Sequence, residues 1–136
     1  MNGRNFNRSE NPPSVRAQLD DIRHLKFGWF DGEIGVPFYA KDLDWLVATW
    51  QYCQPDNVML PYVYPTVLGE IQAEWFFEHY NIILRINLKE HLGRWHYMNM
   101  QQSENGDEER LLDLDNPEEW SWLFQRIYHF QCAEKS

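Results

Sequence analysis

The chain has few cysteines, few basic residues and no long apolar segment. Its two cysteines, Cys53 and Cys132, lie far apart and form none of the paired motifs of a zinc site or a disulfide scaffold. No apolar run approaches the ~20 residues that a membrane-spanning helix requires. The polar N-terminus also lacks the apolar core of a secretory signal. We therefore expect a cytoplasmic protein with reduced thiols, no metal or other cofactor, and no contact with a membrane.

Basic residues are scarce, because 12 Lys and Arg stand against 21 Asp and Glu, for a net charge of −9. Direct nucleic-acid binders need a basic surface to neutralise phosphates, so this balance argues against one. Segment 104–119 holds eight of the acids and a single base, whereas the rest of the chain has 13 acids and 11 bases. Such a concentrated negative charge favours binding to a basic protein surface.

Aromatic residues make up 16% of the 136 residues and include seven Trp. A chain of this length forms one domain and buries about two thirds of its unfolded surface. The aromatic content exceeds what a small core usually needs, so we expect some of these side chains at a surface that meets a partner.

Three helices are predicted from capping residues and from apolar residues at a spacing of three to four. Residues 1–13 are polar and are expected to form a disordered arm, which leaves 14–136 as a single domain. Ser14 is the expected cap of a helix over 15–27, and a second helix is expected over 40–52. The third begins at Asn116, which is followed by a proline and, at the third helical position, a glutamate.

Alternating patterns predict about five strands between the second and third helices. The expected strands comprise residues 62–66, 70–77, 82–88, 94–101 and 110–114. Short turns join them, including Val67–Gly69 and the polar turn Ser103–Asp107, which contains the hairpin dipeptide Asn105-Gly106. Short turns imply antiparallel pairing, and the apolar stripes of the helices imply that they cover one face of the sheet.

The hairpin over residues 60–77 is the best defined feature of the sequence. Its second strand directs one set of side chains to the core, namely Ile71, Ala73, Trp75 and Phe77. Tyr64, Gln72 and Glu74 are expected on the opposite face. Glu74 is a candidate general acid, since an apolar neighbour raises the pKa of a carboxyl group. No second reagent is evident beside it, so the ordinary interpretation is an acid on the solvent face.

Two motifs between residues 25 and 88 have a recognisable order and spacing. The first is Gly28-Trp29-Phe30-Asp31-Gly32 with Gly35-Val36-Pro37, and the second is Pro65-Thr66, Gly69, Ile71-Gln72 and Glu74-Trp75 with a following strand over 82–86. Together they resemble a family of small bacterial proteins of unassigned function, which show GWDGYGA-x-P, PTPEGG-[IV]-Q-x-EW and an LEI strand. The chain departs from that pattern at the inserted Phe30, at Val67-Leu68, at Glu70 and at Arg85. The resemblance implies no activity, and it implies genes near mobile elements, toxin–antitoxin systems or defence loci.

The glycine-rich loop over residues 28–35 is not a phosphate-binding loop. It lacks both glycine fingerprints for phosphate, and the acids Asp31 and Glu33 would repel one. Two acids are also too few for a divalent cation site. We expect the glycines to turn the chain, so that Trp29 and Phe30 close one end of the core.

Histidine and cysteine give only a weak indication of a metal or nucleophilic site. His129 and Cys132 are three residues apart on the last expected helix, and Cys53 and His96 are the other possible zinc ligands, but the spacing matches no zinc motif. A Cys132 nucleophile is disfavoured, because the C-terminal end of a helix raises the pKa of a thiol. A buried structural thiol is the expected interpretation.

The acidic segment has two interpretations. In the ordinary one, acids favour the N-terminus of the last helix and the others lie in a solvated loop. In the functional one they form a negative patch beside Trp122, which lies round the helix from Trp120 and Phe124 and is expected to be exposed.

We therefore expect an α+β domain without catalytic machinery, with an antiparallel sheet over about residues 60–114 packed by two N-terminal helices and one C-terminal helix. The favoured hypothesis is an acidic protein-binding module of the antitoxin, immunity or inhibitor type in bacterial or phage defence. Its partner would be a basic protein, such as one that binds nucleic acid. The alternatives are a small enzyme or ligand-binding protein that uses the hairpin face, and a structural subunit of a larger assembly. The candidate partner-binding residues are Glu104, Asp107, Glu108, Glu109, Glu118, Glu119, Trp122, Tyr64, Gln72 and Glu74.

Overall fold

The computed structural model describes residues 12–99 and 108–135, which fold into a five-stranded antiparallel sheet with three helices. The elements in chain order are α1 (Val15–Ile22), α2 (Ala40–Cys53), β1 (Tyr62–Pro65), β2 (Ile71–Phe76), β3 (Tyr80–Asn87), β4 (Leu92–Asn99), β5 (Glu108–Asp113) and α3 (Pro117–Lys135). The strands follow one another in space in the order of the sequence, and every neighbouring pair is antiparallel. The predicted α+β class is confirmed.

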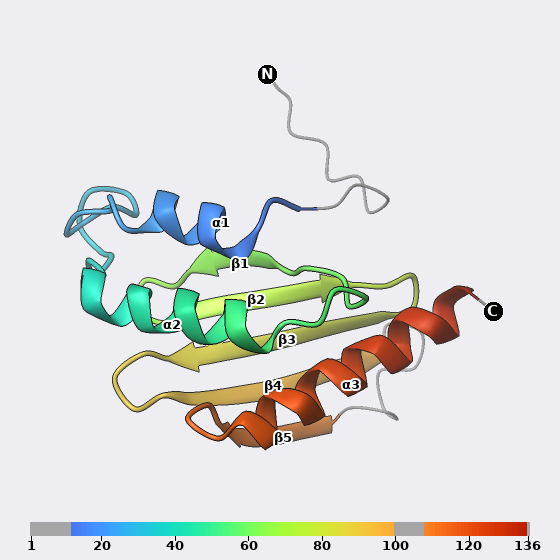
Figure 1. Ribbon diagram of the computed structural model, residues 1–136. Helices are drawn as coiled ribbons and strands as arrows, with labels where there is room; N and C mark the ends of the chain where they lie inside the picture. The colour runs from blue at the N-terminus through green and yellow to red at the C-terminus, as the bar shows by residue number, and fades with distance from the viewer. Residues whose placement is uncertain (1–11, 100–107, 136) are drawn as a thin grey trace.

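All three helices lie on the same side of the sheet (Figure 1). The core fills the space between the two layers, because the side chains that alternate towards the helices are buried along β2, β3 and β4. Trp50 of α2 stands at its centre, with ring centroids 6.1 Å from Trp75 and 5.1 Å from Trp120. Four of the seven Trp are almost fully buried, namely Trp50, Trp75, Trp95 and Trp120. Most of the tryptophan surplus therefore belongs to the core.

The first helix is shorter than the apolar spacing predicts. It ends at Ile22, five residues before the predicted end at residue 27, and the amide of Arg23 makes the last helical hydrogen bond. The side chain of Leu25 still packs against the core, whereas that of Phe27 is 75% exposed, so the apolar stripe ends before Phe27. The bounds of the other described elements agree with the predicted ones to within two residues. The predicted turn at 103–107 lies outside the described residues. So does the predicted N-terminal arm, apart from Pro12 and Pro13.

The glycine loop forms a small closed hairpin beside the start of α2. The amide of Gly28 donates to the carbonyl of Gly35 at 2.8 Å, and Phe30 bridges to Ile34. Trp29 packs on the core, and its indole N–H donates to the carbonyl of Val36 at 3.0 Å. Phe30 is 52% exposed, so the prediction that it closes the core is wrong. Adjacent residues of a hairpin point to opposite sides, which leaves only Trp29 on the core side.

The outer edge of β1 is protected by a side chain of α1. The amide group of Gln18 donates to the carbonyl of Pro61 at 2.9 Å, and its oxygen accepts from the amide of Val63 at 2.7 Å. This pair of contacts imitates a neighbouring strand, so the edge is closed to another chain at that point. Partner binding by strand addition at this position of β1 is thereby disfavoured.

Candidate functional site

The side of the sheet that faces away from the helices, here called the open face, brings together residues from distant parts of the sequence. The strand register places Tyr62 opposite Glu74, Glu74 opposite Ile83, Ile83 opposite His96, and His96 opposite Glu109. This row crosses all five strands. It joins the hairpin to Glu109 of the acidic segment, two regions whose proximity the sequence alone does not reveal.

A second row lies beside the first and carries the basic residues of the open face. In order across the sheet it consists of Tyr64, Gln72, Arg85, Arg94 and Leu111. The guanidinium group of Arg85 donates to the amide oxygen of Gln72 at 3.0 Å. Arg94 stands directly opposite Arg85, a like-charge arrangement that is unfavourable unless an anion or acceptor is shared between them.

Apolar side chains surround the carboxyl group of Glu74. Tyr62 and Ile83 are its cross-strand neighbours, and the ring of Phe76 lies 5.8 Å from that of Tyr62. Burial among these groups raises the pKa of Glu74, and a hydrogen bond with Gln72 opposes the rise. Glu74 is therefore a partly desolvated acid, whose charged form gains from contact with a cation.

Glu74→Gln is expected to stabilise the fold at neutral pH and to lose this advantage in acid. The folded-state pKa of Glu74 is raised, so the folded protein holds this proton more tightly than the unfolded chain does. Ionisation at neutral pH then costs stability, which the neutral amide does not lose, and the cost disappears as pH falls through the raised pKa. Urea unfolding of both proteins across the acidic to neutral range measures the difference. Glu109→Gln, an exposed member of the same row, is the control, and an equal profile for both variants would contradict the assignment to Glu74.

Two acids of the predicted patch lie on the helix side of β5 and are held in ion pairs. The carboxylate of Glu108 accepts from Arg126 at 2.7 Å, and that of Glu119 accepts from Arg110 at 3.2 Å. The indole of Trp95 also donates to Glu108, at 3.3 Å. These carboxylates already have cationic partners within the chain, which reduces what they can offer to another protein.

Trp122 is half-buried, so the prediction that it is exposed is wrong. Its ring packs edge-on against Trp95 at 5.3 Å, and the guanidinium group of Arg110 lies 4.2 Å from its centre. The helical wheel correctly separates Trp122 from Trp120. Because α3 lies along the β5 side of the sheet (Figure 1), however, both faces of its first turns find partners.

The other predicted partner-binding residues are divided between two surfaces. Tyr64, Gln72, Glu74 and Glu109 belong to the open face, as their positions in the two rows place them. Glu118 is exposed at the first turn of α3, on the helix side. Glu104 and Asp107 lie outside the described residues. Alternation predicted the hairpin part of the face, but Ile83, Arg94 and His96 were missed because their place depends on the register of β3 and β4.

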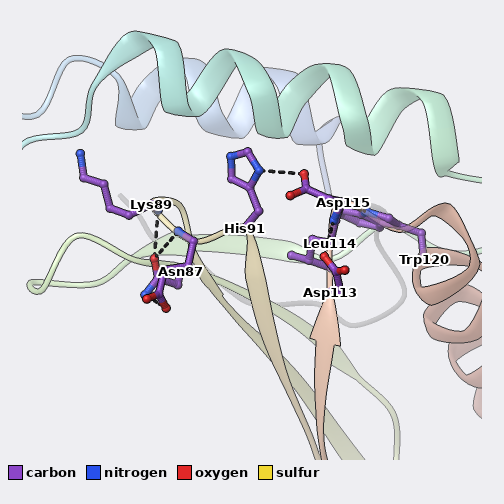
Figure 2. A network of polar contacts seen from close by, with 8 residues as sticks. Asn87, Lys89, His91, Asp113, Leu114, Asp115 and Trp120 are labelled. Atoms are coloured by element: carbon purple, nitrogen blue, oxygen red, sulfur yellow. Dashed lines mark hydrogen bonds and ion pairs between the residues drawn. The ribbon is translucent and has the colours of Figure 1, made fainter.

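On the helix side of the sheet, a polar network ties the β3–β4 turn to the start of α3 (Figure 2). The ring of His91 lies with Nδ1 2.8 Å from a carboxylate oxygen of Asp115 and stacks on Trp45 of α2 at 3.6 Å. The amide of Leu114 donates to the carbonyl of His91, and the carbonyl of Leu114 accepts from the indole of Trp120. Asp115, another acid of segment 104–119, therefore already has a partner within the chain and helps to hold the turn in place.

The possible zinc ligands are not brought together. His96 lies on the open face, whereas Cys53 and His129 belong to the helix layer on the other side of the sheet. Among residues 12–99 and 108–135, no three His, Cys, Asp or Glu side chains form a group that could hold a metal ion. In the same part of the chain, no helix combines the length and apolar character needed to cross a membrane.

Comparisons of the chain with protein-family models, with curated proteins and with solved structures find no match. The family resemblance of residues 25–88 therefore stays a prediction.

Proposed function

We propose that the chain is an acidic protein-binding module of the inhibitor type, which docks on a basic partner protein through the open face. The observation that supports this most is the composition of that face. On the side of the sheet away from the three helices it carries seven aromatic or aliphatic side chains, of which Leu111 is exposed and the others are half-buried: Tyr62, Tyr64, Phe76, Ile83, Leu92, Met98 and Leu111. Aromatic residues, Met and Arg, which this face combines, are enriched at surfaces that meet another protein.

The charges of the open face define what its partner must present. Glu74 is partly desolvated and lies in one row with the exposed Glu109, so two cationic side chains of a partner would each find a carboxylate. An acidic or carbonyl group of the partner placed between Arg94 and Arg85 would relieve the repulsion of these like charges. The net charge of −9 would steer a basic partner towards the chain before these contacts form.

As an inhibitor, such a module needs no reagent of its own. It would cover the basic surface by which its partner holds phosphate groups, and binding would exclude the nucleic acid from that surface. The aromatic and aliphatic side chains would supply most of the affinity, and the acids would supply the rate of association and the choice of partner. We propose accordingly that the chain has no catalytic activity.

Glu109→Lys is expected to weaken partner binding by about tenfold or more, whereas Glu118→Lys is expected to weaken it far less. Both residues are exposed, and both substitutions change the net charge equally, so long-range attraction falls to the same extent. Only Glu109 lies on the open face, so only its reversal places a like charge against the partner. The tagged chain and both variants would be used to recover the partner from the native host, with affinities and association rates then measured at low and high salt.

Equal losses for the two variants would overturn the open face as the docking surface and leave only general electrostatic attraction. Glu74→Lys serves as a second variant in the centre of the face, and its circular dichroism would be compared with that of the parent. Loss of binding by a folded Glu74→Lys, with retention by Glu118→Lys, supports the proposal. A partner bound equally by all three variants contradicts it.

A further inference from the structure

A second concave surface lies in the helix layer, on the other side of the sheet from the open face. The C-terminal end of α2, the segment that follows it and the middle of α3 come together there (Figure 1). The ring centroids of Trp50 and Phe124 lie 6.0 Å apart. They enclose a groove of about 410 Å³. Its lining residues are Tyr52, Cys53, Pro55, Asn57, Val58, Pro117, Ser121, Phe124, Gln125 and Tyr128.

The floor of this groove is fixed by the core. Val58 and Phe124 are 6% and 2% exposed. The side chain of Gln54 accepts from the indole of Trp50 at 2.8 Å and donates to the carbonyl of Val58 at 2.8 Å. The side chain of Gln131 on α3 accepts from the amide of Met59 and donates to the carbonyl of Asn57, both at 2.9 Å. These contacts hold the segment after α2 against α3, so the groove is formed without a ligand.

The walls are aromatic and extend into solvent. Tyr52 is 86% exposed and Tyr128 is 40% exposed. The neighbouring thiol of Cys132 raises the pKa of the Tyr128 phenol. Two rings that project beside a buried apolar floor provide flat surfaces for a flat ligand.

None of the ten lining residues is charged, although 24% of the chain is Asp, Glu, Lys or Arg. Cys53 and Tyr128 also stay neutral, because burial raises the pKa of Cys53 and the neighbouring Cys132 raises that of Tyr128. A charged ligand would lose its hydration without gaining a counter-charge here. The amides of Asn57 and Gln125 and the hydroxyl of Ser121 can still donate and accept hydrogen bonds.

We propose that the groove between α2 and α3 binds an uncharged, flat, mainly apolar small molecule. Its volume lies within the range of about 300–1,000 Å³ that is usual for small-ligand sites. A smaller hollow of about 260 Å³ shares Tyr52, Cys53 and Pro117 with it and extends the site along α2. The assignment is independent of the proposed protein-binding function, because the two surfaces lie on opposite sides of the sheet.

Two fluorescent probes with the same aromatic skeleton test the assignment on the full chain. N-phenyl-1-naphthylamine is neutral, and 1-anilinonaphthalene-8-sulfonate adds a negative charge. The neutral probe is expected to bind in a saturable manner and about tenfold or more tightly than the charged one. Ser121→Phe, which fills the groove from an exposed helix position, is expected to weaken binding of the neutral probe by about tenfold or more.

Glu118→Phe is the matched control, because it adds the same side chain one turn earlier on α3, outside the lining. Retention of probe binding by Glu118→Phe together with its loss in Ser121→Phe supports the site. Equal binding by both variants, or no binding by the parent chain, overturns it. Sedimentation velocity would show whether a second copy of the chain occupies the groove instead. A dimer of the parent chain that Ser121→Phe dissociates would make the groove a self-interface and contradict a small-molecule site.

Discussion

Trp50→Ala is expected to lower the free energy of unfolding by about 3–5 kcal/mol, the usual cost of removing a large aromatic side chain from a core. Trp50 is 2% exposed and touches three aromatic rings at once: Trp75 at 6.1 Å, Trp120 at 5.1 Å and Phe124 at 6.0 Å. These rings come from β2 and α3, so Trp50 joins both later parts of the fold to α2. Because domains of this size are stable by about 5–15 kcal/mol, one substitution would remove a large share of the total.

Tyr52→Ala provides the matched control for Trp50→Ala. It removes an aromatic side chain of the same helix two residues later, but Tyr52 is 86% exposed, and its loss is expected to change stability by less than about 0.5 kcal/mol. Urea unfolding followed by far-ultraviolet circular dichroism measures both. A loss below about 1 kcal/mol for Trp50→Ala would mean that the aromatic contacts between the layers contribute little.

The architecture was predictable because its signals are local. Alternation in residues 71–77 assigns Ile71, Ala73 and Trp75 to the core, and all three are at most 1% exposed. The caps are equally local, since the hydroxyl of Ser14 accepts from the backbone amide of Ala17 and the side-chain oxygen of Asn116 accepts from the backbone amide of Glu118. Each of these features depends on residues within a few positions of one another.

The surfaces were less predictable because they depend on how the elements are placed. Trp122 was expected to be exposed, since a helical wheel relates it to Trp120 but not to Arg110 and Trp95 on neighbouring strands. The row from Tyr62 to Glu109 requires the register of four strand pairs, and a shift of one residue in any strand would change its members.

The groove between α2 and α3 had a sequence signal that was missed. Ser121, Gln125 and Tyr128 follow one another at helical spacing and form an uncharged stripe in a helix that also contains Glu118, Glu119 and Arg126. The stripe was predictable as a helix face that avoids charge. Its pairing with Tyr52 and Val58 was not, since it depends on the path of the segment after α2.

Gly35→Ala is expected to destabilise the protein by about 3 kcal/mol or more, since two independent costs apply. Gly35 has φ +119°, a conformation that side chains other than glycine adopt only with strain of about 1–3 kcal/mol. A Cβ atom there would also lie 2.8 Å from two atoms of the Trp29 indole. Trp29 is fixed by its packing on the core and by its hydrogen bond to Val36, so it cannot move aside without losing contacts.

Gly32→Ala separates the two costs. Gly32 also has a positive φ, +84°, but no atom outside its immediate neighbours lies within 4 Å of a Cβ built there. Only the conformational cost of about 1–2 kcal/mol is therefore expected. Unfolding midpoints of the two variants in urea, followed by far-ultraviolet circular dichroism, measure the difference. If the two substitutions lower the free energy of unfolding equally, the close approach of Gly35 to Trp29 is not the reason for a glycine at position 35. The positive φ alone would then account for it.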